Sequence, residues 1–247
     1  MGQSQDDWEV LWCHPGFYLT AERLRSHLPP WCRMRLVDPS VPLRDQVATA
    51  KVLVPAAARI TPDILDAAKE LRLISQAGTG YDSIDVAACR ARNVPVCRCP
   101  GLNAQSVAEA AFGALLAMTK KFSEQVQAFN KTTPGVVVGV QLAGRTMGII
   151  GMGSIGAAMT KMAQGMSMRV ISTRSSSSRA ELEHLLRESD VVSLSCPLND
   201  ATRGLIGREE LAMMKRGSYL LNFARGAIID RQALIDTLEG EDNPLAG

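Results

Sequence analysis

The stretch that decides the fold is Thr146-Met-Gly-Ile-Ile150, followed at once by Gly151-Met-Gly-Ser-Ile-Gly156. The first five residues predict a buried strand, and the next six fit the G-x-G-x-x-G pattern and open a helix expected over 154–164. In this context the first glycine permits a tight turn, the second lets the backbone approach a pyrophosphate, and the third lets the helix pack close to the strand. A glycine-rich turn without a ligand is the alternative, but the flanking strand and helix favour a dinucleotide-binding unit.

The second strand of this unit, expected over 168–173, indicates which nucleotide binds. An NAD site usually has an acidic residue about 20 positions after the glycines, where it holds the ribose 2′-hydroxyl. Here the strand leads to Arg174, and no Asp or Glu occurs between Glu124 and Glu181. Arg174 and the hydroxyls of Ser175–Ser178 are suited to bind a 2′-phosphate, which a carboxylate would repel. We therefore expect NADP(H) rather than NAD(H); a solvent-facing Arg174 without a ligand is the alternative.

The rest of the chain alternates short apolar runs with helical patterns. Strands are expected at 9–13, 34–37, 51–54, 71–75 and 94–97, with helices after Pro62 and over 83–92; further strands are expected at 191–196 and 219–223, with helices at 179–187, 209–215 and 231–238. Such alternation predicts parallel sheets covered on both faces. A single long helix over 105–129 is expected to bridge two α/β units, which meet near residue 103.

The composition is that of an ordinary globular protein, with 46% hydrophobic and 21% charged residues among 247. A net charge of +2 gives no reason to expect nucleic acid as a partner. The longest apolar run, at 108–118, contains a glycine and is too short to span a membrane, and no secretory signal is evident at the N-terminus. The six cysteines lack metal-site spacing, so we expect reduced thiols, no metal and a cytoplasmic location.

Five motifs follow one another in a fixed order: Gly78-Thr-Gly-Tyr-Asp-Ser-Ile-Asp85, Asn103 with Val107-Ala-Glu109, the glycine motif, Ser189-Asp-Val-Val192 leading to Cys196-Pro-Leu198, and Asn222-Phe-Ala-Arg-Gly226. In this order they resemble the D-isomer-specific 2-hydroxyacid dehydrogenase family, which includes glyoxylate and hydroxypyruvate reductases, phosphoglycerate dehydrogenase, formate dehydrogenase and a group of corepressors. The resemblance covers nearly all of the chain from about residue 50. It implies two Rossmann-like domains, a flavodoxin-like substrate domain at 1–103 and an NAD(P)-binding domain at 104–247, with the active site between them.

The resemblance also implies roles for single residues. Thr79 and Gly80 would offer backbone N–H groups to the substrate carboxylate, and Asn103 matches a substrate-binding asparagine. Arg225 matches the catalytic arginine, whose planar fork suits a carboxylate or carbonyl oxygen; a surface ion pair is the alternative for this residue. The cofactor contacts that the resemblance implies, together with Arg174, are Val107, Gly151, Gly153, Ser154, Ile155, Gly156, Cys196, Pro197, Thr202, Phe223, Ala224 and Arg225.

Some positions depart from the family pattern. Phosphoglycerate dehydrogenases have an arginine where this chain has Gln76, and a second one that aligns with Pro55. A phosphate needs cationic partners, so both differences favour a small unphosphorylated acid such as glyoxylate or hydroxypyruvate, although Arg59 lies nearby in the sequence. The segment 173–190 is also shorter than the family pattern, which predicts a trimmed connection after the second strand.

The family continues beyond the region of Ala246 and Gly247 into a strand with an aspartate, then a catalytic glutamate and a proton-donating histidine. Here the only histidines are His14, His27 and His184, which we interpret as solvated or structural. We therefore expect a C-terminally truncated dehydrogenase that acts weakly by itself and forms a homodimer through the nucleotide domain. The alternatives are a non-catalytic NAD(P)-binding interaction or regulatory protein, as among the corepressors, and a phosphoglycerate dehydrogenase.

Overall fold

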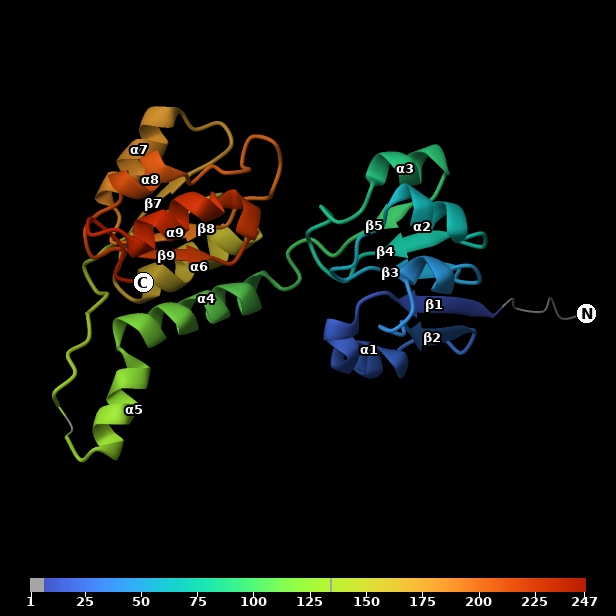
Figure 1. The fold of residues 1–247 in the computed structure, drawn as a ribbon, viewed down its shortest axis with the longest axis horizontal. Helices are drawn as coiled ribbons and strands as arrows, with labels where there is room; N and C mark the ends of the chain where they lie inside the picture. The colour runs from blue at the N-terminus through green and yellow to red at the C-terminus, as the bar shows by residue number, and fades with distance from the viewer. Residues whose placement is uncertain (1–6, 134) are drawn as a thin grey trace, which may run out of the picture. The chain divides into compact units, whose positions relative to one another are not determined.

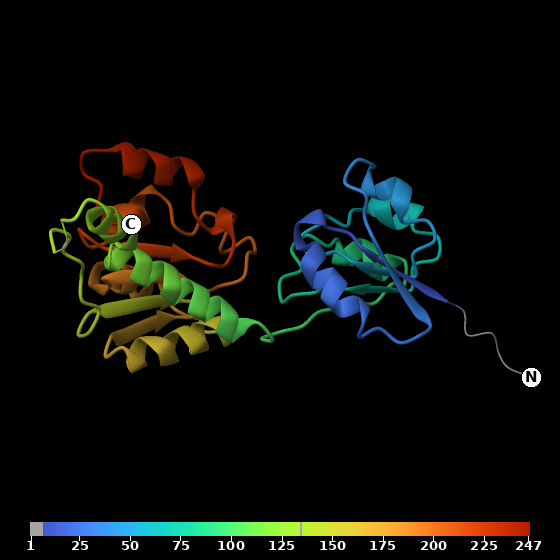
Figure 2. The ribbon, with the colours of Figure 1, turned by 90° about the horizontal axis from the view of Figure 1, so that it is seen from below.

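The computed structural model describes residues 7–133 and 135–247, and the chain divides between Leu102 and Asn103 into two compact units, called unit 1 and unit 2. This division lies one residue before the boundary that the sequence predicts. Each unit has its own parallel sheet, as the alternation of strands and helices predicts (Figure 1 and Figure 2). The fold class expected from the sequence is therefore confirmed.

Unit 1 is built on a five-stranded parallel sheet of order β2-β1-β3-β4-β5, the flavodoxin-like order 2-1-3-4-5. Its strands are β1 (Trp8–Trp12), β2 (Cys32–Leu36), β3 (Val52–Val54), β4 (Leu73–Ser75) and β5 (Val96–Cys97), and its helices are η1 (Pro15–Phe17), α1 (Tyr18–Arg25), η2 (Leu43–Gln46), α2 (Pro62–Ala67) and α3 (Val86–Ala91). Alternate residues of β1 face opposite sides, since side chains in a strand repeat every two residues. Leu11 packs in the core that includes α2 and α3, whereas Trp12 packs with Ala21 of α1.

Two features of unit 1 differ from what the sequence predicts. Helix α1 was not expected, because only Ala21 of its residues is buried and the sequence shows no apolar stripe there. Helix α2 begins as expected with Thr61 at the N-cap and Pro62 in its first turn, but the Thr61 hydroxyl donates to the Asp63 carboxylate and accepts no backbone N–H of the first turn.

Unit 2 is built on a four-stranded parallel sheet of order β7-β6-β8-β9. Its strands are β6 (Thr146–Ile150), β7 (Arg169–Thr173), β8 (Val191–Leu194) and β9 (Tyr219–Asn222), and its helices are α4 (Ala104–Thr119), α5 (Phe122–Asn130), α6 (Ser154–Gly165), α7 (Arg179–Glu188), α8 (Arg208–Met213), η3 (Gly226–Ile228) and α9 (Arg231–Glu239). The doubly wound order 3-2-1-4-5-6 places a third strand outside the second. In the described residues no further strand follows β7, because the chain runs through 174–178 into α7. With only β6 beside it, β7 is an edge strand of the sheet.

The long helix expected over 105–129 is two helices, and this prediction is corrected. Helix α4 ends at Thr119, where Lys120 caps it, and α5 starts at Phe122 after Lys121 adopts left-handed backbone angles (φ 52°). The Lys120 N–H donates to the Leu116 carbonyl at 2.8 Å, which satisfies one of the last four carbonyls of α4. Helix α4 packs against α6, whereas of α5 only Ala128 is buried (Figure 1).

The last residues of the chain pair with the edge of the sheet at 217–220. The Gly217 N–H donates to the Pro244 carbonyl at 2.7 Å, and the Ala246 N–H donates to the Ser218 carbonyl at 2.7 Å. The Leu220 N–H donates to the Gly247 carbonyl at 3.0 Å, so residues 244–247 run parallel to β9 along the edge of the sheet.

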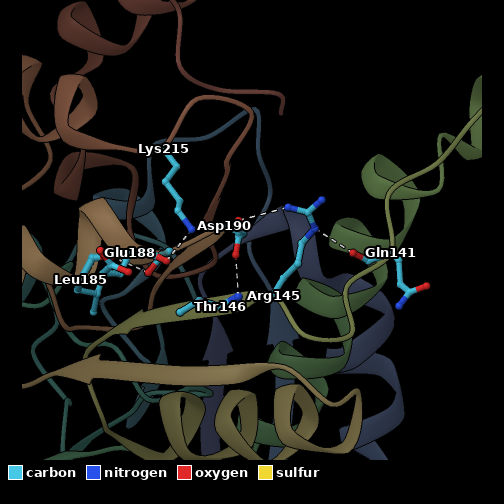
Figure 3. Close-up of polar contacts among 8 residues, drawn as sticks. Gln141, Arg145, Thr146, Leu185, Glu188, Asp190 and Lys215 are labelled. Carbon is cyan, nitrogen blue, oxygen red and sulfur yellow. Dashed lines mark hydrogen bonds and ion pairs between the residues drawn. The ribbon is translucent and has the colours of Figure 1, made fainter.

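A charged cluster fixes the amino ends of the central strands (Figure 3). Asp190, which precedes β8, accepts the N–H of Thr146 at 2.8 Å and also contacts Arg145 and Lys215, each at 3.3 Å. The Arg145 Nε donates to the Gln141 carbonyl at 3.0 Å. Burial raises the pKa of Asp190, but these hydrogen bonds and cations outweigh burial and leave the pKa below its usual value.

Candidate functional site

The glycine motif forms the turn from β6 into α6, and two of its positions accept only glycine. Gly151 has a φ of +102°, and a Cβ there would lie 2.6 Å from the backbone nitrogen of Cys196. A Cβ on Gly156 would lie 2.1 Å from the Gly151 carbonyl oxygen. At Gly153, by contrast, a Cβ would meet nothing within 4 Å, so the fold leaves that side of the backbone open.

The start of α6 presents a row of backbone donors. The first hydrogen bond of this helix runs from the Ala157 N–H to the Gly153 carbonyl at 2.9 Å, and Gly153 has no side chain to cap it. Among the described residues, the N–H groups of 152–156 donate to no acceptor, and no acidic residue lies in the first turn. Free N–H groups and the positive end of a helix dipole together suit a phosphate group.

The site lies where the order of the strands reverses. The chain passes from β6 to β7 on one side and then returns to β8 on the other side of β6. The Gly151 N–H donates to the Thr173 carbonyl at 3.0 Å, and the Ser195 N–H donates to the Ile150 carbonyl at 2.8 Å. The carboxyl ends of all four strands therefore form one edge, with the glycine loop in its middle, as in doubly wound nucleotide sites.

The expected cofactor residue Arg174 lies at this edge, directly after β7. It is exposed, and among the described residues its guanidinium has no hydrogen bond or ion pair. Its backbone N–H donates to the Ser177 hydroxyl at 3.2 Å, and the Ser177 N–H donates to the Arg174 carbonyl at 3.0 Å. The side chain of Arg174 is therefore fixed at its base and open at its tip.

The four serines of this loop do not all have open hydroxyls. Ser178 forms a capping box with Glu181 at the start of α7, and the hydrogen bonds from the Ser178 N–H and hydroxyl lower the pKa of that carboxyl. Ser177 closes the turn back to Arg174. Ser175 and Ser176 have no hydrogen bond in the part of the chain that the structure describes. Of the four hydroxyls expected to bind a 2′-phosphate, those of Ser175 and Ser176 are therefore the two that remain open to it.

Beside the glycine loop, the end of β8 continues into Cys196 and Pro197. Cys196 is buried against Gly151, and burial raises the pKa of its thiol. The Thr202 hydroxyl donates to the Pro197 carbonyl at 2.6 Å and accepts the Asn199 N–H at 2.9 Å. The expected cofactor residue Thr202 therefore shapes the loop 197–202.

The end of β9 carries the expected catalytic arginine. The Asn222 side chain donates to the Arg225 carbonyl at 2.8 Å and accepts the Ala224 N–H at 3.1 Å, so it closes a turn over Phe223. Asn222 was not among the expected site residues; a polar residue at the end of an apolar strand was the available signal. An Arg225 Nη1 donates to the Ala224 carbonyl at 2.9 Å, and the side chain is half-buried.

Unit 1 has a second run of backbone N–H groups without acceptors, in the loop after β4. The carbonyls of Gly78, Thr79, Gly80 and Tyr81 accept hydrogen bonds from the Cys99 N–H (3.1 Å), Arg98 Nη1 (3.2 Å), Gln76 Nε2 (2.7 Å) and the Ile84 N–H (3.0 Å) respectively. In contrast, the N–H groups of 77–81 donate to no acceptor among the described residues. A run of N–H groups with its carbonyls already bound is suited to hold an anion such as a carboxylate.

The remaining expected residues are placed as follows. Asn103 caps α4 through its carbonyl, which accepts the Val107 N–H at 3.0 Å, and its side chain makes no capping hydrogen bond. Val107 lies in the first turn of α4 and is half-buried. Within 7–133 and 135–247, no group of three or more His, Cys, Asp or Glu side chains could hold a metal, and all six cysteines are free. No helix in the described ranges has the length and apolar character needed to cross a membrane.

The comparisons with known proteins agree with this geometry. Residues 112–247 match the model of the D-isomer specific 2-hydroxyacid dehydrogenase, NAD binding domain. A hydroxypyruvate reductase from Thermotoga maritima is 36% identical over 194 residues, which are 75% of this chain and 63% of that protein. A glyoxylate reductase from Thermococcus kodakarensis is 32% identical over 240 residues, or 88% of this chain and 72% of that protein.

A solved structure is also similar. The D-lactate dehydrogenase from Aquifex aeolicus, complexed with NAD and lactic acid, has a TM-score of 0.80 and 25% identity, covering 97% of this chain and 75% of that one. The chain spans about three fifths of the length of the Thermotoga maritima reductase. Since the family model matches more than half of the chain, the chain belongs to the D-isomer specific 2-hydroxyacid dehydrogenase family.

Proposed function

We propose that this chain serves an oxidoreductase that transfers a hydride between NAD(P)H and a small 2-keto or 2-hydroxy acid of the glyoxylate or hydroxypyruvate kind. The observation that carries the proposal is the glycine loop, with five unpaired N–H groups at 152–156 and an open side at Gly153. The names of the relatives support the reaction class, since they are reductases of glyoxylate and hydroxypyruvate.

The residues at the carboxyl edge of unit 2 fit a dinucleotide. The N–H groups of Ser154, Ile155 and Gly156 would hold the pyrophosphate, because they lie at the positive end of α6 and have no other acceptor. Pro197, Phe223 and Ala224 would lie against the nicotinamide, which supplies the hydride when the cofactor is bound. The open tip of Arg174, with the hydroxyls of Ser175 and Ser176, supports NADP(H) over NAD(H).

The substrate would be held through its carboxylate. We assign this group to the N–H groups of the loop 77–81, including those of Thr79 and Gly80, because these N–H groups have no acceptor among the described residues and the carbonyls of 78–81 are already bound. Arg225 would orient the keto acid through its guanidinium, and Asn103 would add a polar contact. Gln76 and Pro55 supply no cation for a phosphate, so the unphosphorylated acids are favoured over phosphoglycerate.

Reduction of a keto acid also needs a proton for the carbonyl oxygen. Of the three histidines, His14 accepts the Gly16 N–H at 2.9 Å at the start of η1, His27 bonds to the Arg23 carbonyl at 3.0 Å, and His184 is on α7. None lies on the strand ends that carry the glycine loop or Arg225. We therefore expect the 247-residue chain to bind cofactor and keto acid but to turn over slowly.

The test is direct. Binding of NADPH and NADH is measured by fluorescence titration, and turnover is measured with glyoxylate and hydroxypyruvate. Tight NADPH binding with slow turnover is the expected result, and absence of any nicotinamide binding would overturn the proposal. If the chain binds the cofactor but oxamate, a carboxylate analogue of the keto acids, causes no change in unit 1, the non-catalytic, regulatory alternative gains support.

We also propose a homodimer formed through the nucleotide-binding unit. Three large apolar side chains of α5, Phe122, Val126 and Phe129, are 53%, 60% and 74% exposed. Their spacing of four and three residues places them on one face of the helix. A contiguous apolar face of this kind marks an interaction site, and a second copy of the chain would cover it with the same face.

A further inference from the structure

Gln76 directly follows β4 and is 4% exposed, yet it is one residue from the exposed start of the anion-binding loop. Its side-chain Nε2 donates to the Ala56 carbonyl at 2.9 Å and to the Gly80 carbonyl at 2.7 Å. Both neighbours are acceptors, so only the nitrogen of the amide can face them, and this fixes the orientation of the side chain. The Oε1 atom is buried without a partner in the described part of the chain.

The two carbonyls belong to different loops. Ala56 lies in the loop after β3 and has left-handed backbone angles (φ 54°), which are strained for a residue with a Cβ. Such strain persists only where surrounding contacts hold it. Gln76 is the side chain that binds the Ala56 carbonyl, and through its second hydrogen it ties this loop to Gly80 in the loop after β4.

The bond to Gly80 bears directly on the anion-binding N–H groups. The carbonyls of Gly78 and Tyr81 accept backbone N–H groups, and that of Thr79 accepts Arg98, which is exposed and lies over the Tyr81 ring at 5.1 Å. Of the two side chains that donate to carbonyls of this loop, Gln76 is buried and Arg98 is exposed. Because a peptide group is planar, a fixed Gly80 carbonyl also fixes the direction of the Tyr81 N–H.

We propose that Gln76 is a positioning residue: by clamping the carbonyls of Ala56 and Gly80 it holds the N–H groups of 77–81 toward the substrate carboxylate, and so sets the affinity for the keto acid. This inference rests on the proposed function of that loop.

The experiment compares the full chain with Gln76→Met and Gln76→Glu. Methionine has a similar length but cannot donate, and an ionised glutamate keeps the shape and polarity while offering only acceptors to two carbonyls. The control is Gln46→Met, because Gln46 Nε2 also bridges two carbonyls of unit 1, those of Asp38 (2.9 Å) and Val41 (2.8 Å), away from the 77–81 loop. Far-UV circular dichroism and thermal unfolding establish that each variant is folded.

Two readouts separate this inference from the proposed function. The first is the ¹⁵N order parameter of backbone amides without ligand: we expect rigid values of about 0.85 at 77–81 in the unsubstituted chain and values below about 0.6 in both Gln76 variants. The second is titration with oxamate, for which both Gln76 variants should bind at least tenfold more weakly while NADPH binding in unit 2 stays within twofold. Gln46→Met should leave the loop and both affinities unchanged.

Equal order parameters at 77–81 in the Gln76 variants and the unsubstituted chain would overturn the clamp. Oxamate affinity in Gln76→Met within twofold of that of the unsubstituted chain would also overturn it. If oxamate perturbs no amide of the unsubstituted chain, the proposed carboxylate site fails, and the order parameters still decide whether Gln76 holds the loop. If Gln76→Met does not fold, the order parameters and the oxamate affinity are both measured on Gln76→Glu.

Discussion

The Oδ2 atom of Asp190 accepts the backbone N–H of Thr146 at 2.8 Å, and this bond joins the residue before β8 to the first residue of β6 (Figure 3). The carboxylate side chain is 20% exposed and also contacts Arg145 and Lys215. We predict that Asp190→Ala lowers the free energy of unfolding by about 2 kcal/mol, because it removes a charge-assisted hydrogen bond and leaves the Thr146 N–H unpaired. Urea unfolding at pH 7 measures this difference.

The same pair predicts a pH dependence. The pKa of Asp190 is lower in the folded chain than its ordinary value, so its contribution is complete above the ordinary pKa of about 3.9 and is lost as the pH falls through the lower folded value. The difference in unfolding free energy between the unsubstituted chain and Asp190→Ala should therefore shrink below about pH 3.9. Asp200→Ala is the control, since Asp200 is exposed and makes no side-chain bond among the described residues. A difference that stays constant from pH 7 to pH 3 contradicts this account.

Gly153→Ala tests the cofactor loop without disturbing the fold. A Cβ at Gly153 meets nothing within 4 Å and φ there is −78°, so stability should change little. The methyl group would stand where the backbone must approach a pyrophosphate, so NADPH affinity should fall at least tenfold, about 1.4 kcal/mol. Fluorescence titration gives the affinity, and thermal unfolding gives the stability.

The matched control is Gly165→Ala, at the far end of the same helix. A Cβ there also meets nothing within 4 Å, and alanine is the better helix former by up to about 1 kcal/mol. This variant should bind NADPH like the unsubstituted chain. Equal binding by Gly153→Ala and Gly165→Ala would argue against a pyrophosphate at this turn.

The sequence was sufficient to predict features whose cause is local. Glycine is required at positions 151 and 156 by contacts within or beside their own turn. The spacing of these glycines directly after an apolar strand is a pattern that the sequence alone shows. The end of α4 was not predictable, because Lys121 adopts left-handed angles without being glycine or asparagine. The clamp by Gln76 depends on Ala56, which lies 20 positions earlier, and only the fold brings the two together. Side chains that bind distant carbonyls leave no periodic signal.

Arg174→Ala tests the choice between the two nicotinamide nucleotides. Arg174 has an open guanidinium at the end of β7, so its loss should weaken NADPH binding by about 10- to 100-fold, as expected for charge-assisted hydrogen bonds to a phosphate. NADH lacks the 2′-phosphate and should bind equally well to both proteins. The control is Arg169→Ala, which removes an exposed cation at the other end of the same strand. A parallel loss of NADH and NADPH affinity in Arg174→Ala would contradict a phosphate-specific role.

The apolar face of α5 predicts the state of assembly. Val126→Lys places a charge in the middle of the face formed with Phe122 and Phe129, so burying that face against a second copy becomes unfavourable. We expect a dimer for the unsubstituted chain and a monomer for Val126→Lys in light scattering coupled to size exclusion. Gln127→Lys adds the same charge to an exposed position about a quarter of the helix circumference away and should leave the dimer intact. Because α5 contributes only Ala128 to the buried residues of its own unit, neither substitution should lower the thermal stability of the monomer, and a monomeric unsubstituted chain would reject this interface.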